Sequence, residues 1–271
     1  MVPNIPAIAT YLYDKLQVQK VKFRTLENNA AAISKYLPLV DGYSVFSHPV
    51  IKRLRQASYH IAPPEPKYTE FWDAELVLEA WNTPSKDLSL LDLSRKTYTL
   101  CKLMSMGRDA DITNFQVPKR DPLTYDRDNT QFIVLKRGVL TKSQKRGSKG
   151  LVKIEAFKPE KADICPVRSL IDYLVKSQPL RHRDANEIFV SSAKPHKPIA
   201  KATGGKWLIH SLNRAGIDTT RYSGHSFRGA AANSRRNAGA SITRILKEGM
   251  WKSEEVLRRY YLREDHNLQS D

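Results

Sequence analysis

The chain has 271 residues, and its composition narrows the classes of protein to which it can belong. Its formal net charge of +17 favours a polyanionic partner such as nucleic acid over an acidic membrane surface. Hydrophobic residues make up 41% of the chain, enough to form a buried core. No stretch of about 18 apolar residues is present, which argues against a transmembrane helix. The N-terminus lacks a signal-peptide pattern and two cysteines form no disulfide framework, so we expect a reducing compartment and no secretion.

The first 62 residues have the apolar spacing of helices. This spacing predicts helices over 26–37 and 49–59, with a turn at Asp41-Gly42 between them. The polar face of the second helix is basic, and it is either a solvated face or a surface that contacts DNA phosphates. Three cations lie on it: Lys52, Arg53 and Arg55.

A proline-rich segment over residues 62–67 follows these helices. Its three prolines cannot continue a helix, because proline lacks the backbone N–H and fixes φ. We therefore predict a domain boundary here, between a helical region over 1–62 and a larger domain over 63–271.

The larger domain begins with two predicted helices, over 72–81 and 94–106. Thr69 is a start signal ahead of the first helix. The second helix is largely apolar, so we expect it to be buried and to end at Gly107.

The periodicity then changes to that of strands. Residues 132–135 and 150–154 are rich in β-branched residues and predict two strands. The segment between them, 142–149, predicts a hairpin tip that is strongly basic. Over residues 131–160 the chain has eight basic and two acidic residues, which suits contact with a polyanion.

The remaining pattern is mostly helical. It predicts, in chain order, a helix over 167–175, a strand over 187–191, a basic loop over 194–201, and helices over 207–215, 226–238, 241–247 and 253–263. Gly216 and Gly239 are predicted helix stops, and Ser241 and Ser253 are predicted N-caps. The fold class is therefore mainly α with a small antiparallel β-sheet (α+β).

The stretch Gly224-His225-Ser226-Phe227-Arg228 carries the first chemical signal. His225 and Arg228 are three residues apart at a predicted helix start, so both side chains project from one face. The free N–H groups of a helix N-terminus also attract an anion. Together these groups suit a phosphate, although a plain surface pair explains the same spacing.

Two tyrosines near the C-terminus carry the second signal. Tyr260 lies nine residues after Trp251, and Tyr261 follows it. Leu257 and Tyr261 are four residues apart and share a packing face, so at least one tyrosine anchors the core.

Arg108 carries the third signal. It follows the predicted buried helix and Gly107, a placement that holds an arginine in one position. Asp111 lies three residues later, so a local Arg108–Asp111 ion pair is the alternative interpretation.

The order of these motifs resembles that of the tyrosine recombinase (phage integrase) family. The motifs are Gly-Arg-x-x-Asp, a basic hairpin, Gly-His-x-x-Arg, and Gly-x-Trp followed by a tyrosine. The resemblance covers roughly residues 65–265. The segment Ile164–Leu174 also resembles the corresponding helix of recombinases from eukaryotic mobile elements, the cryptons and the tyrosine-recombinase retrotransposons.

The resemblance implies a catalytic domain over 63–271 that cuts DNA by attack of a tyrosine hydroxyl, leaving a 3′-phosphotyrosine and a free 5′-hydroxyl. The covalent intermediate keeps the bond energy, so neither metal nor cofactor is expected. The implied roles are a clamp on the phosphate oxygens by Arg108 and Arg228, a proton acceptor or donor in His225, a ring N–H donor in Trp251, a supporting carboxylate in Asp111, and the nucleophile in Tyr260, with Tyr261 as the second candidate.

The family also has a hairpin lysine that protonates the leaving oxygen. By position Lys142 fits this role first, then Lys145, then Lys149. We expect Lys145, Arg146 and Lys149 to contact DNA phosphates, as we do for the basic face of the N-terminal helix.

These implications predict a site-specific recombinase or integrase of a mobile element that binds double-stranded DNA and associates into dimers or tetramers on it. In a eukaryotic host we expect it in the nucleus, and otherwise in the cytoplasm or nucleoid. We expect residues 1–62 to be a partial version of the family's core-binding (DNA clamp) region, for which they are short. With eight residues after Arg263, we expect no long C-terminal exchange helix. The alternatives are a DNA-binding module that no longer cuts, a type IB topoisomerase, and a basic RNA- or scaffold-binding protein.

Overall fold

The computed structural model describes residues 3–119, 121–138, 150–182 and 185–262. The chain divides into two units, Met1–Lys67 and Tyr68–Asp271. This division lies at the end of the proline-rich segment, five residues after the boundary that the sequence predicts.

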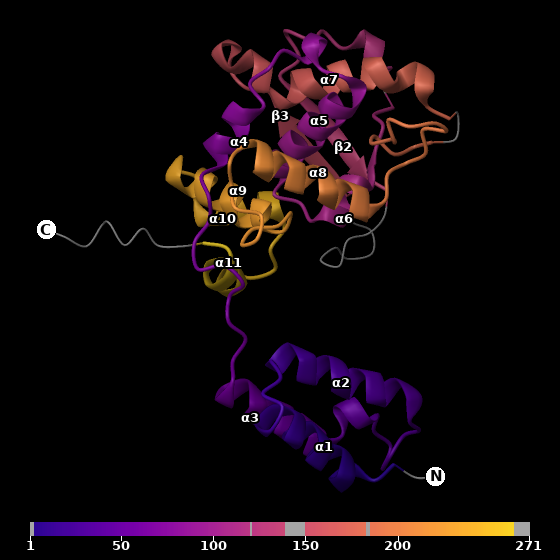
Figure 1. Cartoon of the computed structure of the whole chain (residues 1–271), viewed down its shortest axis with the longest axis vertical. Coiled ribbons are helices and arrows are strands. Elements are labelled where there is room, and N and C mark those ends of the chain that lie inside the picture. Colours follow the sequence, from indigo (N-terminus) through magenta and orange to yellow (C-terminus); the bar gives the residue numbers. More distant parts are fainter. Residues whose placement is uncertain (1–2, 120, 139–149, 183–184, 263–271) are drawn as a thin grey trace, which may run out of the picture. The chain divides into compact units, whose positions relative to one another are not determined.

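The first unit is a small helical bundle (Figure 1). Its helices are α1 (Ile5–Gln17), α2 (Phe23–Tyr36) and α3 (Pro49–Ile61). Leu12, Leu26 and Ile51, one from each helix, are fully buried in its core. The predicted helices at 26–37 and 49–59 are confirmed as α2 and α3. The spacing did not locate α1, which the Asn4 side chain caps by accepting a hydrogen bond from the Ala7 N–H.

The second unit is built around one buried helix, α5 (Leu90–Ser105). This helix packs against α7 (Pro166–Ser177), α8 (Lys201–Arg214) and α9 (Ser226–Asn237). The expectation of a buried helix here is confirmed. Its end is set by Met106, which adopts a left-handed conformation (φ 47°), and not by Gly107.

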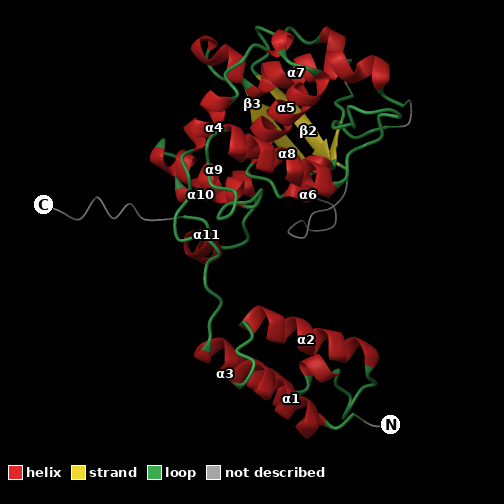
Figure 2. Cartoon of the chain, viewed as in Figure 1, coloured by secondary structure: helices red, strands yellow, loops and turns green. Residues whose placement is uncertain are grey.

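The sheet of the second unit is small and antiparallel (Figure 2). Its order is β1 (Phe115–Gln116), β2 (Phe132–Arg137) and β3 (Leu151–Glu155). Alternate residues of β2 and β3 are buried, as the strand period requires. The expectation of two strands, which pair antiparallel, is therefore confirmed, as is the α+β class. The predicted hairpin tip over 142–149 lies outside the described residues.

The predicted strand over 187–191 is wrong. This segment forms only isolated bridges, Gln116↔Glu187 and Val190↔Pro198. Its Val190 N–H donates to the Tyr173 hydroxyl at 3.0 Å, so a side chain takes the hydrogen bond that a ladder would need.

The remaining helices are α4 (Ala74–Ala80), α6 (Asp109–Thr113), α10 (Ile242–Gly249) and α11 (Glu254–Tyr260), and short 3₁₀ turns lie at Val45–Ser47, Ser85–Asp87, Pro122–Thr124, Pro159–Ile164 and Gln178–Leu180. Asp73, and not Thr69, caps α4. Ser241 and Ser253 cap α10 and α11 as predicted, because each side chain accepts a backbone N–H of the first turn.

Helix α8 begins six residues before the predicted start at residue 207, and tertiary packing accounts for this. Gly204 lies against Tyr98 of α5, where a Cβ would come within 2.3 Å of the tyrosine hydroxyl. The glycines of this segment weaken the sequence signal for a helix, whereas close packing against α5 requires Gly204. None of the described helices is both long and apolar enough to cross a membrane.

Candidate active site

Arg108 is held by its backbone at the start of α6. The left-handed Met106 turns the chain out of α5, and Arg108 becomes the N-cap residue of α6. Its backbone N–H donates to Asp111 Oδ2 at 2.8 Å, and Asp111 is buried. Asp111 therefore fixes the Arg108 backbone. The guanidinium keeps a buried Nη1 without a hydrogen-bond partner in the described part of the chain.

Lys102 supports this turn from inside α5. Its Nζ donates to the Gly107 carbonyl at 2.8 Å and to the Asp109 carboxylate, so it holds the residues on both sides of Arg108. The side chain is 1% exposed, and burial lowers the pKa of its ammonium group. The sequence reasoning missed this residue, although a lysine inside a largely apolar helix was a usable signal.

Arg228 joins two helix ends. It lies in the first turn of α9 and is 1% exposed. Its guanidinium donates to the Met106 carbonyl at the end of α5 and to the Gly249 carbonyl at the end of α10, the latter at 2.7 Å. Burial lowers the pKa of Arg228 to about 10, so the group stays charged at neutral pH. The surface-pair interpretation is therefore wrong for Arg228, whereas His225 is exposed.

Trp251 covers the guanidinium of Arg228. Met250 adopts a left-handed conformation (φ 53°) after α10, and Trp251 follows it. The Arg228 Cζ lies 3.8 Å from the Trp251 ring centroid, a cation–π contact. Gly249 is required here, because a Cβ would lie 1.8 Å from the indole. The Trp251 Nε1 is buried without a partner among the described residues.

Tyr261 is the tyrosine that the structure brings to these residues. Its hydroxyl lies 3.4 Å from His225 Nε2, and its ring centroid lies 5.4 Å from the Arg228 Cζ. Leu257, one helical turn earlier, is fully buried and directs this face of α11 inward. Tyr260, which the spacing from Trp251 favours, has its ring 5.5 Å from the Arg259 Cζ instead.

The converging groups are mainly donors. Arg108 Nη1, Arg228 Nε and Trp251 Nε1 are all buried N–H groups without an acceptor in the described residues. An unsatisfied buried donor is costly, and a bidentate anion such as phosphate satisfies guanidinium donors well. A tyrosine hydroxyl next to an imidazole supplies a nucleophile with a proton acceptor. These residues can therefore bind a phosphodiester and present a hydroxyl to it. We call them the cluster: Arg108, His225, Arg228, Trp251 and Tyr261.

Solved structures resemble the chain over most of its length, among them three recombinase structures. XerA recombinase matches with 16% identity, a TM-score of 0.51 and coverage of 98% of this chain and 81% of that one. XerH site-specific recombinase, bound to palindromic difH substrate, matches with 12% identity and a TM-score of 0.56, covering 95% of this chain and 68% of that one. A lambda integrase dimer bound to a COC′ core site matches with 13% identity and a TM-score of 0.55, covering 99% of this chain and 82% of that one. The chain has the tyrosine recombinase fold. No protein-family model and no curated protein sequence matches it.

The remaining predicted site residues are the candidate hairpin lysine and the candidate DNA contacts. Lys142, Lys145, Arg146 and Lys149 lie outside the described residues. Lys52 and Arg53 are exposed on α3.

Arg55 is engaged inside the first unit. It pairs with Glu27, and its Cζ lies 3.6 Å from the Phe46 ring centroid. Arg55 therefore links α2 and α3 through its partners, and its contact with DNA stays a prediction.

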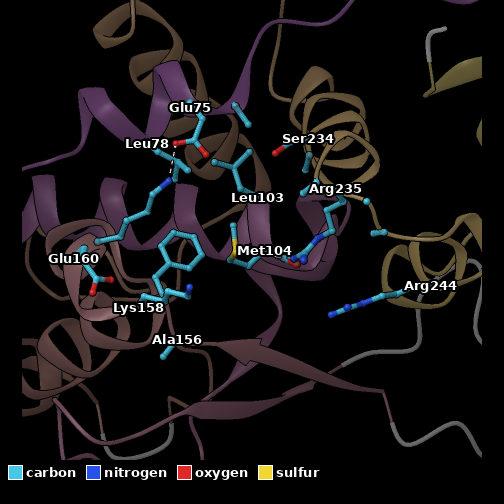
Figure 3. Close-up of a pocket in the computed structure, with 17 residues that line it drawn as sticks. Glu75, Leu78, Leu103, Met104, Ala156, Lys158, Glu160, Ser234, Arg235 and Arg244 are labelled. Carbon is cyan, nitrogen blue, oxygen red and sulfur yellow. Dashed lines mark hydrogen bonds and ion pairs between the residues drawn. The ribbon is translucent and has the colours of Figure 1, made fainter. Parts of the chain in front are cut away.

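A separate pocket of about 600 Å³ lies between α4, α5, α9 and α10 (Figure 3). Leu103 and Met104 form part of its wall, and Arg235 and Arg244 lie along one side. Its described lining includes none of the residues around Arg228, so it is a different site from the cluster. In the described ranges no group of three or more His, Cys, Asp or Glu side chains could hold a metal ion.

Proposed function

We propose that this protein is a DNA strand transferase of the tyrosine type, a site-specific recombinase or integrase that cuts and rejoins DNA through a 3′-phosphotyrosine. The observation that carries the proposal is Tyr261, whose hydroxyl lies 3.4 Å from His225 Nε2 beside the buried guanidinium of Arg228. The unpartnered donors around it favour a phosphate ligand. The similar XerH and lambda integrase structures are described as bound to DNA sites, which supports the same class of substrate here.

The proposed cleavage step is a transesterification. Tyr261 Oη forms a bond to phosphorus, and its proton passes to His225 Nε2. The bond from phosphorus to the 5′-oxygen breaks, and that oxygen takes a proton from a hairpin lysine, for which Lys142 is the first candidate. Arg108 and Arg228 stabilise the charge that gathers on the nonbridging oxygens. Rejoining is the reverse step with a new 5′-hydroxyl, so the number of ester bonds is conserved without a metal or cofactor.

Basic residues in each of the two units would hold double-stranded DNA by its phosphates. Exposed Lys52 and Arg53 on α3 and the hairpin cations Lys145, Arg146 and Lys149 are the candidate contacts. Self-association on DNA is part of the proposal, since the similar lambda integrase is described as a dimer on its core site. A mobile element of the crypton or retrotransposon type, and a nuclear location in a eukaryotic host, are the context that the segment Ile164–Leu174 favours.

A covalent trapping assay tests the proposal. The wild type, Tyr261→Phe and Tyr260→Phe are each incubated with a library of nicked DNA duplexes in the presence of EDTA, and denaturant-stable protein–DNA adducts are mapped by peptide mass. We expect adducts from the wild type and from Tyr260→Phe, but none from Tyr261→Phe, because the phenol oxygen forms the bond. Filter binding should show similar DNA affinity for all three proteins.

The two tyrosines make each outcome informative. Loss of adducts only in Tyr260→Phe would transfer the nucleophile to Tyr260, as the spacing from Trp251 favours. DNA binding without adducts from any of the three proteins would contradict strand transfer and favour a DNA-binding module that does not cut.

A further inference from the structure

Arg137 is a buried guanidinium beside the cluster that the motifs did not identify. It is the last residue of β2, where it faces the core with Ile133 and Leu135, and it is 4% exposed. Its backbone N–H donates to the Gly150 carbonyl at 3.0 Å, which closes the neck of the β2–β3 hairpin. The segment that carries the candidate lysines therefore lies between two residues, Arg137 and Gly150, whose backbones are paired.

The guanidinium of Arg137 has almost no acceptors. Nη1 lies 3.0 Å from the Met250 Sδ, and a thioether sulfur is a weak acceptor. Nε and Nη2 are buried without any hydrogen-bond partner among the described residues. Buried polar groups in folded proteins are normally satisfied, so an arginine left in this condition calls for a reason other than stability.

Arg181 shows what a structural arginine looks like in the same unit. Its guanidinium donates to the Ser177 hydroxyl and to the carbonyls of Glu187 and Ile188. Every nitrogen of this group has an acceptor, and none of these contacts belongs to the cluster. The difference between Arg137 and Arg181 lies in their partners, since both side chains are held within the fold.

The neighbours of Arg137 are residues of the cluster. Met250 lies between Gly249, whose carbonyl accepts from Arg228, and Trp251, whose ring covers Arg228. Burial lowers the pKa of Arg137, while Asp111 raises it and Arg108 lowers it. Asp111 already accepts the Arg108 N–H. Among the described residues it is the one carboxylate that raises the pKa of both Arg137 and Arg228, and Arg108 lowers both. The region carries an excess of buried positive charge.

We propose that Arg137 is a third guanidinium of the phosphate site, which places positive charge beside the scissile phosphate from the neck of the hairpin. This inference rests on the proposed function, since it assigns Arg137 to the same phosphate. Arg137 acts through its charge in a region of low dielectric, where an anion offsets the burial of the Arg137 and Arg228 guanidinium groups. In the absence of the anion, the same charge destabilises the fold.

The matched variants are Arg137→Met, Arg137→Lys and the control Arg181→Met. Methionine is apolar and fits beside Phe115 and Met250, so Arg137→Met should fold. We expect its melting temperature to equal or exceed that of the wild type, because an unsatisfied buried charge is removed. Arg181→Met should melt at a lower temperature, because it leaves buried carbonyls without donors. Arg137→Lys keeps the charge and should retain most of the function.

Two functional measurements separate charge from structure. The first is single-turnover cleavage of a normal nicked duplex and of one with a neutral methylphosphonate at the scissile position. We expect Arg137→Met to be at least about tenfold slower than the wild type on the phosphodiester, and nearly equal to it on the methylphosphonate. An equal defect on both substrates, together with a lowered melting temperature, would overturn the proposal in favour of a purely structural role.

The second measurement needs no cleavage, so it separates failure of this inference from failure of the proposed function. Inorganic orthovanadate, a phosphate-like anion, should raise the melting temperature of the wild type and of Arg181→Met. The rise should be much smaller for Arg137→Met and restored in Arg137→Lys. An identical rise in Arg137→Met and the wild type would overturn the proposal, whether or not the wild type cuts DNA.

Discussion

Buried N–H donors have acceptors in one part of the second unit and lack them in another. Where α4, α5 and α8 pack, Trp81 Nε1 donates to the Ser211 hydroxyl at 3.0 Å, and Lys96 Nζ donates to the Thr83 carbonyl. At the cluster, Arg228 Nε and Trp251 Nε1 are equally buried but have no acceptor within the described residues. The first group stabilises the fold through its partners. The second holds donors ready for an anionic ligand at the expense of stability, which is the usual condition of a functional site.

The largest test of this comparison is Arg228→Lys. Lysine keeps the positive charge, but its donors sit on one nitrogen and cannot replace the separate guanidinium nitrogens that reach the Met106 and Gly249 carbonyls. We expect single-turnover cleavage of nicked DNA to fall by at least about 100-fold, roughly the effect of losing one preorganised donor to a transition state. DNA affinity should change little. A rate within a few-fold of the wild type would remove Arg228 from the site.

A pair of tryptophan variants compares the two regions directly. Trp251→Phe removes the unpartnered Nε1–H, and Trp81→Phe removes the one that donates to Ser211. We expect Trp251→Phe to slow cleavage by about tenfold with little change in unfolding free energy. Trp81→Phe should lower the unfolding free energy by about 1–2 kcal/mol and leave cleavage by the folded protein unchanged. Denaturant melts and single-turnover rates measure both, and a reversed pattern would contradict the division into two regions.

A third test concerns the pH dependence of stability and Lys96, a partnered lysine of the core. Burial lowers the pKa of Lys96 to about 8, whereas the unfolded chain keeps this lysine protonated until about pH 10.4. Between these values the unfolded state binds more protons, so this group makes the unfolding free energy rise with pH. From pH 7 to pH 10 we expect the wild type to gain about 2 kcal/mol relative to Lys96→Met. Parallel stability profiles for the two proteins would show that Lys96 is not desolvated.

Much of the fold was predictable because its signals are local. The spacing of apolar residues located α2, α3 and α5, and the content of β-branched residues located β2 and β3. Ser241 and Ser253 marked helix starts through hydrogen bonds that span only three residues. The failures came where distant contacts override a local signal. The Val190 N–H donates to the Tyr173 hydroxyl, and α8 extends over Gly204, which fits against Tyr98.

The candidate site divides in the same way. Motif spacing identified Arg108, His225, Arg228 and Trp251, and the structure brings Arg228 and Trp251 into contact and His225 to Tyr261. Spacing favoured Tyr260 because it counts residues along the chain. The choice between adjacent tyrosines depends on the rotation of α11, which the packing of Leu257 sets.

By itself, the sequence determined the element types, the basic charge and the order of the chemical motifs, because each depends on residues that are close along the chain. Only the tertiary structure decided that Tyr261 faces His225, that Arg55 is paired with Glu27, and that Arg137 lies buried without acceptors beside the cluster. These properties depend on which groups meet across long sequence separations and which buried donors find partners. Both are set by packing, which no local pattern encodes.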